Sequence, residues 1–84
     1  MALQTVVETP EFIKRADTVG MSDGDRSSVI ERLANNSGEG VSLGGGLRKV
    51  RVPRRGGGKS GGYRVLYFYH STNLPLFLLT VFAK

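Results

Sequence analysis

The segment from Gly62 to His70 is apolar on both faces of an extended chain, and this constrains the fold more than any other feature. One face would carry Tyr63, Val65, Tyr67 and Tyr69, and the other Arg64, Leu66, Phe68 and His70. Both faces are largely apolar in the middle of the segment, which is typical of a central strand of a sheet. Leu76 to Ala83 is a second apolar run of this kind. In Leu47 to Pro53, valines alternate with bases, as in a half-buried strand.

The first half of the sequence predicts two short helices, each preceded by a residue that favours an N-cap. Thr9-Pro10-Glu11 supplies an N-cap hydroxyl, a proline at the first helical position and an early acid. Ser22 and Asp25 form a weaker capping pair for a second helix that ends at Asn35-Asn36. Both helices are apolar on one side only. Each must therefore pack against the sheet.

These elements predict an α+β fold in which a small antiparallel sheet, in β-α-α-β-β-β order, carries both helices on one face. The first strand is expected at Leu3 to Val7. With 84 residues the chain makes one domain, residues 1–84. It has no cysteine and one histidine, which excludes a disulfide framework and argues against a metal site or another cofactor. No segment predicts a signal peptide or a membrane span, so we expect a cytoplasmic protein that does not contact a membrane.

Charge is divided sharply along the chain. All seven acids lie before residue 40, whereas the residues from 40 to 84 carry eight bases and no acid. Seven of these bases fall within 17 residues: Arg48, Lys49, Arg51, Arg54, Arg55, Lys59 and Arg64. A fold that gathers them on one surface attracts a polyanion. RNA, DNA, a membrane or an acidic protein would each neutralise this charge.

The glycine-rich segment Gly56-Gly57-Gly58-Lys59-Ser60 is not a nucleotide-binding loop. That motif needs a glycine five positions before Gly58, where this chain has Pro53, and it joins a strand to a helix. Here a strand follows. We expect instead a hairpin loop whose bases contact a nucleic-acid backbone.

Lys49 and Arg51 share one face of their strand, about 7 Å apart. Arg64 on the next strand could complete a triangle of fixed cations, suited to an anionic transition state at phosphorus. The alternative is that these three bases have no catalytic role and lie on a solvent-exposed face of the sheet. His70 ends its strand, and histidine is the side-chain type best suited to proton transfer near neutral pH, although it could equally be structural. Tyrosines on the other face are expected in the core rather than under a nucleobase.

Four segments together resemble a known family. They are Gly46 to Val52 (GLRKVRV), Gly58 to Gly62 (GKSGG), Tyr63 to His70 (YRVLYFYH) and Val81 to Lys84 (VFAK). This pattern is similar to that of the RelE/HigB toxins of type II toxin-antitoxin systems. The resemblance implies a RelE-like fold and a toxin that enters the ribosomal A site, cuts messenger RNA and is neutralised by a cognate antitoxin. It implies attack by the RNA 2′-hydroxyl on the adjacent phosphate, with neither a metal nor a covalent enzyme intermediate.

The resemblance also suggests roles for individual residues. Lys49 and Arg51 are expected to orient the phosphate and transfer protons, and Arg64 to stabilise the transition state. Lys84 and, less securely, His70 are further catalytic candidates. The bases expected to contact RNA or the ribosome are Arg48, Arg54, Arg55 and Lys59.

One departure from the family pattern concerns the C-terminus. Family members usually continue past the final strand into a charged, often helical segment, whereas this chain stops at Lys84. We expect the missing segment to weaken activity and to expose the apolar face from Leu76 to Phe82, which favours a homodimer through this strand. The alternative function is therefore a truncated or inactive toxin that only binds its antitoxin or ribosomal RNA. Inhibition of DNA gyrase, as in the related ParE branch, is a further alternative, but the grouping of Lys49, Arg51 and Arg64 resembles the ribonuclease branch more.

Overall fold

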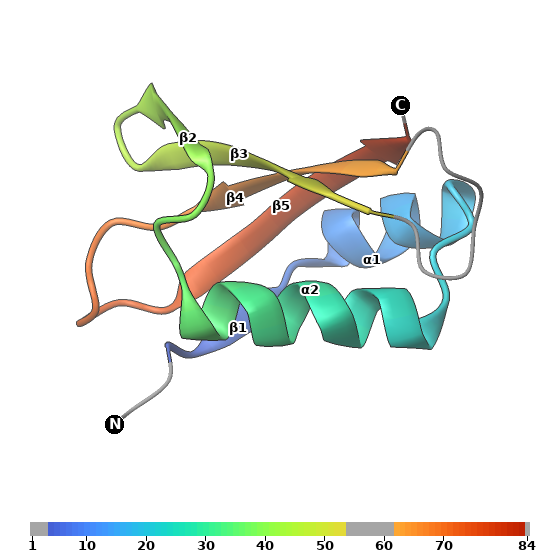
Figure 1. Cartoon of the computed structure of the whole chain (residues 1–84), viewed down its shortest axis with the longest axis horizontal. Coiled ribbons are helices and arrows are strands. Elements are labelled where there is room, and N and C mark those ends of the chain that lie inside the picture. The colour runs from blue at the N-terminus through green and yellow to red at the C-terminus, as the bar shows by residue number, and fades with distance from the viewer. Residues whose placement is uncertain (1–3, 54–61, 84) are drawn as a thin grey trace.

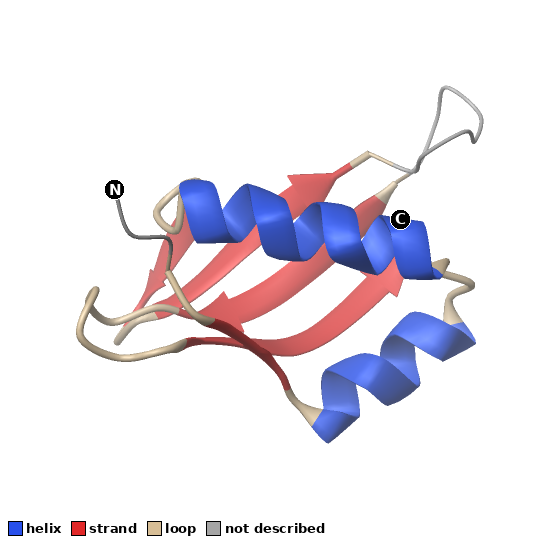
Figure 2. Cartoon of the chain, turned by 90° about the horizontal axis from the view of Figure 1, so that it is seen from below, coloured by secondary structure: helices blue, strands red, loops and turns tan. Residues whose placement is uncertain are grey.

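The computed structural model describes residues 4–53 and 62–83, and it has two helices on one face of a five-stranded sheet (Figures 1 and 2). The elements in chain order are β1 (Val6–Glu8), α1 (Pro10–Thr18), α2 (Asp23–Asn35), β2 (Val41–Gly44), β3 (Leu47–Val52), β4 (Tyr63–Phe68) and β5 (Leu76–Ala83). Across the sheet the strands lie in the order β1-β5-β4-β3-β2. The α+β class and the placement of the helices are as the sequence predicts.

Both helices begin at the capping residues expected from the sequence. The Thr9 hydroxyl accepts a hydrogen bond from the backbone N–H of Phe12 at 3.2 Å, and Pro10 opens α1. At α2, the backbone N–H of Asp25 donates to Ser22 Oγ at 3.0 Å, and the N–H of Ser22 donates to the Asp25 carboxylate at 3.2 Å. This reciprocal capping box fixes where α2 starts.

The sheet differs from the predicted one in two respects. It is mixed, because β1 pairs in parallel with β5, with Val6 opposite Leu76. It also has an additional strand, β2, paired antiparallel to β3. All four residues of β2 are exposed, so this edge strand has no buried face, although Val41 and Leu43 alternate with Ser42 and Gly44 in its short sequence. The expected order β-α-α-β-β-β is therefore corrected to β-α-α-β-β-β-β.

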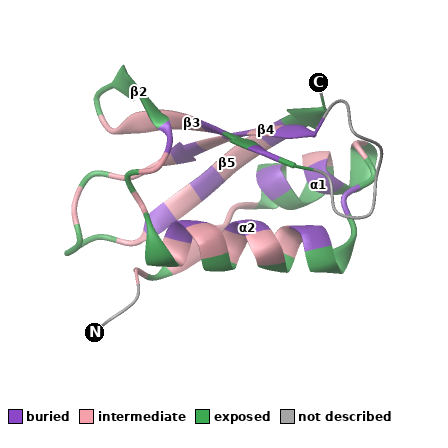
Figure 3. Ribbon diagram, in the orientation of Figure 1, coloured by how far each residue is buried: buried purple, intermediate pink, exposed green. Residues whose placement is uncertain are grey.

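The core lies between the helices and one face of the sheet (Figure 3). β4 and β5 are interior strands, as predicted, and Tyr63 and Tyr67 of β4 are fully buried. The tyrosine face of β4 is thus core and not a surface for bases. No helix in residues 4–53 or 62–83 is long and apolar enough to cross a membrane.

The connection between α2 and β2 is held by hydrogen bonds from the sheet. The Tyr67 hydroxyl accepts from the backbone N–H of Gly40 and donates to the carbonyl of Ser37, both at 2.9 Å. Gly40 is buried so closely that a Cβ there would lie 2.5 Å from the Lys49 carbonyl oxygen. These contacts fix the start of β2, and with it the edge of the sheet beside β3.

Candidate functional site

The face of the sheet turned away from the helices carries three cations on neighbouring strands. Lys49 and Arg51 alternate with the buried Val50 and Val52 on β3, so they point away from the core. Arg64 alternates in the same way with buried residues of β4. We call Lys49, Arg51 and Arg64 the cation cluster. The structure brings these three predicted site residues together.

Arg51 and Arg64 lie directly opposite each other in the antiparallel pairing of β3 and β4. Residues in such a pair have Cβ atoms about 5 Å apart, and like charges placed there destabilise the sheet. On its other side Arg64 is opposite Phe82 of β5. Arg64 Nε is buried and has no hydrogen-bond partner among the described residues. Arg64 is therefore repelled by Arg51 and has a buried N–H donor without an acceptor among the described residues. An oxyanion bound here would reduce the repulsion and accept a hydrogen bond from this donor.

The acids of the described chain do not neutralise this cluster. The ion pairs within residues 4–53 and 62–83 are those of Arg26 with Glu8 and Asp23, and that of Arg32 with Glu39. The hydrogen bonds from Arg32 hold the pKa of Glu39 below its ordinary value, because they favour the carboxylate. Glu8, Asp23 and Glu39 thus pair with bases of the first half and not with the cluster. The three cations of the outer face form no ion pair with the described residues.

Arg48 faces away from the cluster. It lies on the same face of β3 as Val50, and its guanidinium donates to the carbonyls of Gly38 at 3.0 Å and Gly40 at 2.7 Å. It therefore holds the α2–β2 connection. The sequence could have predicted this orientation, because Arg48 is separated by even numbers of residues from the buried Val50 and Val52 of the same strand. The predicted site residues Arg54, Arg55, Lys59 and Lys84 lie outside the described residues.

His70 has the strand parity of the outer-face residues but lies two residues beyond the end of β4. It is six positions after Arg64, about 20 Å along an extended strand. At that backbone separation we do not expect the two side chains to act on one phosphate. His70 stacks instead on Phe68, with ring centroids 6.3 Å apart and an interplanar angle of 12°.

Aromatic side chains on the outer face were not singled out by the sequence. Phe68 of β4 is opposite Phe77 of β5, and the exposed Phe82 lies beside Arg64. Strand alternation could have predicted their orientation, because Phe68 is next to the core residue Tyr67 and so points to the opposite face. The outer face therefore carries the cations and Phe82 at one end of β4, and Phe68 and Phe77 at the other.

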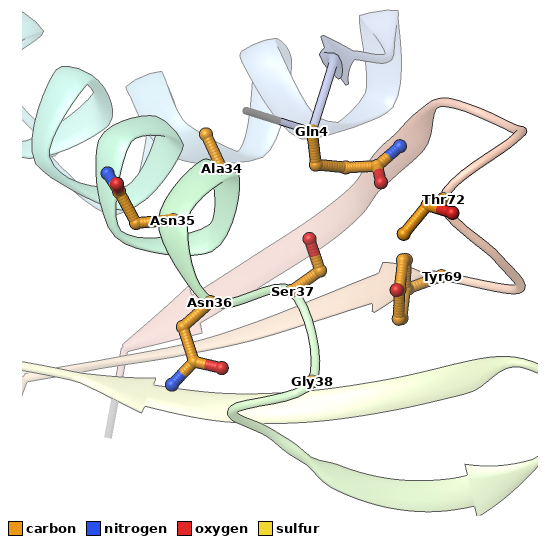
Figure 4. Close-up of a pocket in the computed structure, with 8 residues that line it drawn as sticks. All are labelled: Gln4, Ala34, Asn35, Asn36, Ser37, Gly38, Tyr69 and Thr72. Carbon is orange, nitrogen blue, oxygen red and sulfur yellow. The ribbon is translucent and has the colours of Figure 1, made fainter. Parts of the chain in front are cut away.

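A separate pocket of about 350 Å³ lies on the side of the helices (Figure 4). Its lining is mostly polar and comes from the chain before β1, the end of α2, the α2–β2 connection and the β4–β5 connection: Gln4, Ala34, Asn35, Asn36, Ser37, Gly38, Tyr69 and Thr72. None of the predicted site residues lines it. In the part of the chain that the structure describes, no three His, Cys, Asp or Glu residues are grouped as a metal ion would require.

The interior strand β5 also bears on the expected dimer. It lies between β1 and β4, and Leu76, Leu78 and Val81 are buried in the core. Its large exposed apolar side chain is Phe82 on the outer face, 38% exposed. A homodimer through this strand would have to use that face.

The sequence matches the family model described as the RelE toxin of the RelE / RelB toxin-antitoxin system, over residues 4–84. The match spans nearly the whole chain, including both helices, all five strands and the cation cluster. The fold, with its two helices on one face of a mixed sheet, is consistent with it. The chain therefore belongs to the RelE toxin family.

Proposed function

We propose that this chain is the toxin of a type II toxin-antitoxin system and acts as a ribosome-dependent endoribonuclease that cuts messenger RNA in the ribosomal A site. The observation that supports this most is the cation cluster. Arg51 and Arg64 oppose each other with no acid paired to them in the described chain, and Arg64 Nε is buried without a partner. Such an arrangement is unfavourable for the free protein and favourable with a phosphate in place.

In the proposed reaction, the 2′-oxygen of the substrate forms a bond to the adjacent phosphorus while the bond from phosphorus to the 5′-oxygen breaks. The 2′-hydroxyl loses its proton and the leaving 5′-oxygen gains one. The products are a 2′,3′-cyclic phosphate and a 5′-hydroxyl. Charge builds up on the non-bridging oxygens in the transition state, which is where preorganised cations act.

Within this reaction, Arg64 has the best position to stabilise the phosphorane. It sits on an interior strand between Arg51 and Phe82, so its location is fixed by pairing on both sides. Lys49 and Arg51 approach the phosphate from β3 and are proposed to orient it and to transfer protons. Lys84 remains a proposed participant. His70 is more distant along β4, which favours a role in binding over proton transfer at the same phosphate.

The proposed partners are suggested by membership of the RelE toxin family and by the positive net charge of the chain. The chain has a net charge of +5, and we propose that ribosomal RNA and messenger RNA engage its outer face, with Arg54, Arg55 and Lys59 contacting backbone phosphates. A cognate antitoxin would silence the toxin by covering this surface or by blocking entry to the ribosome. We place the reaction in the cytoplasm, where ribosomes translate.

A toxin that binds without cutting is the second candidate. It is favoured by one observation: the described residues place no carboxylate or histidine beside Arg64 to act as a general base. On that reading the cluster would hold RNA or an antitoxin but would leave the phosphodiester intact.

The test uses purified ribosomes paused on a defined messenger RNA with an open A site. Primer extension would map cuts made by the wild-type chain, with a ribosome-free reaction and a messenger carrying one 2′-deoxynucleotide at the cut position as controls. Endonuclease activity predicts a cut that needs both the ribosome and that 2′-hydroxyl. Stable ribosome binding without cuts would instead establish the binding-only function.

A further inference from the structure

We propose that Phe68 and His70 form a stacking subsite for an unpaired RNA base, at the end of the outer face opposite to the cation cluster. This inference rests on the proposed function, because it assumes that the outer face receives single-stranded RNA. It adds a residue-level site for a nucleobase, whereas the cluster recognises only phosphate.

The two rings already form a preorganised stack. Phe68 is half-buried and His70 is exposed, and their nearly parallel rings lie on the face free of helices. Phe68 is held from both sides of β4, by Leu47 of β3 and Phe77 of β5. Because Phe68 is fixed in this way, it loses little rotamer entropy when a base is added to the stack.

Gly46 makes room for the Phe68 ring. It has a φ of 91°, and a Cβ at this position would lie 2.6 Å from Cε1 of Phe68. The Gly46 carbonyl accepts a hydrogen bond from the backbone N–H of Tyr69 at 2.8 Å, which ties the β2–β3 turn to the end of β4. The ring therefore has one defined location against the turn.

Charge and spacing indicate a nucleic acid as the occupant. Phe68 lies four positions from Arg64 on the same face, about 13 Å along β4, or roughly two nucleotides of an extended strand. A strand with one phosphate at the cation cluster would thus carry a neighbouring base to the rings. Cations combined with aromatic platforms are the usual means of holding single-stranded nucleic acid. An acidic peptide would satisfy the cations but would not require the stack.

The experiment measures binding of a 2′-O-methyl oligonucleotide, which cannot be cut by 2′-hydroxyl attack, by fluorescence anisotropy. The comparison strand has the same backbone but abasic residues. Both are titrated with wild type, with Phe68→Leu, which keeps an apolar side chain but removes the ring, and with Tyr69→Leu. The last variant is the matched control, because Tyr69 is the adjacent ring on the opposite face of the chain and packs against the core.

We expect wild type to bind the base-bearing strand about 5- to 150-fold more tightly than the abasic strand, the range of one stacked base. Phe68→Leu should lose this preference while retaining affinity for the abasic strand, and Tyr69→Leu should keep it. Equal affinity of wild type for both strands, or no binding of either, would overturn the subsite even if Phe68→Leu failed to fold. If wild type prefers the base-bearing strand but does not cut messenger RNA in the ribosome assay, the result would count against the proposed endonuclease activity and not against the stacking subsite.

Discussion

Replacing Arg51 by glutamine should stabilise the fold at low ionic strength, because Arg51 and Arg64 are opposite each other on neighbouring strands. Two unit charges about 6 Å apart in water repel by about 0.7 kcal/mol, and like-charged cross-strand pairs fall in the range of about 0.2–1 kcal/mol. Removing one charge should therefore raise the free energy of unfolding by about 0.5 kcal/mol. The same change should weaken RNA binding, so stability and function would move in opposite directions.

The assay is urea unfolding followed by circular dichroism, at about 0.01 M and about 1 M salt, where the Debye lengths are about 30 Å and 3 Å. The gain should be present at low salt and absent at high salt. Lys14→Gln is the matched control, since this exposed residue of α1 carries the same charge but faces no paired cation. A loss of stability in Arg51→Gln at low salt, or an equal gain in both variants, would refute the argument.

Three further predictions concern the scaffold that positions the site. Tyr67→Phe should lower the free energy of unfolding by about 1–3 kcal/mol, measured by urea denaturation, because the buried N–H of Gly40 loses its acceptor. Ser22→Ala should lower the melting temperature, with a loss of about 1 kcal/mol from the α2 capping box. Glu39→Gln should cost a few tenths of a kcal/mol at neutral pH, since the pair with Arg32 is partly exposed. That difference should vanish in a pH titration of stability as pH falls through the lowered pKa of Glu39.

Local signals in the sequence were sufficient to predict most of the elements. Thr9, Ser22 and Asp25 mark the helix starts because a side chain there satisfies a specific backbone N–H. Apolar residues on both faces of the sequence segments likewise mark β4 and β5 as interior strands. β2 could not be predicted in this way. It is held by backbone pairing to β3 and by contacts of the preceding connection with Arg48 and with Tyr67, which is 27 residues from Gly40.

The parallel pairing of β1 depends on tertiary contacts of the same kind. Its three residues have no pattern that selects β5 as a neighbour, and the pairing is supported by the hydrogen bond from the backbone N–H of Leu76 to the carbonyl of Thr5. An N-terminal strand read in isolation is compatible with either edge of the sheet and either direction.

At the site, strand alternation in the sequence predicts Lys49, Arg51 and Arg64 on the outer face, and the same alternation puts Arg48 on the inner face of β3 and Phe68 on the outer face of β4. Arg48 turns inward to cap carbonyls of the α2–β2 connection. Phe68 turns outward, because β4 alternates strictly between buried tyrosines or valine and half-buried residues. The burial of Arg64 Nε could not be predicted, since it depends on how neighbouring strands pack around that side chain.

The most direct test of the account is the single-turnover rate of messenger RNA cleavage on programmed ribosomes by Arg64→Ala, beside wild type and Lys14→Ala. If Arg64 stabilises the phosphorane, its removal should slow cleavage by about 10²–10³-fold, as for other preorganised donors at a developing oxyanion. Lys14→Ala, which removes a cation from α1, should cleave at the wild-type rate. Cleavage by Arg64→Ala at the wild-type rate would contradict the claim that the cation cluster is the working site.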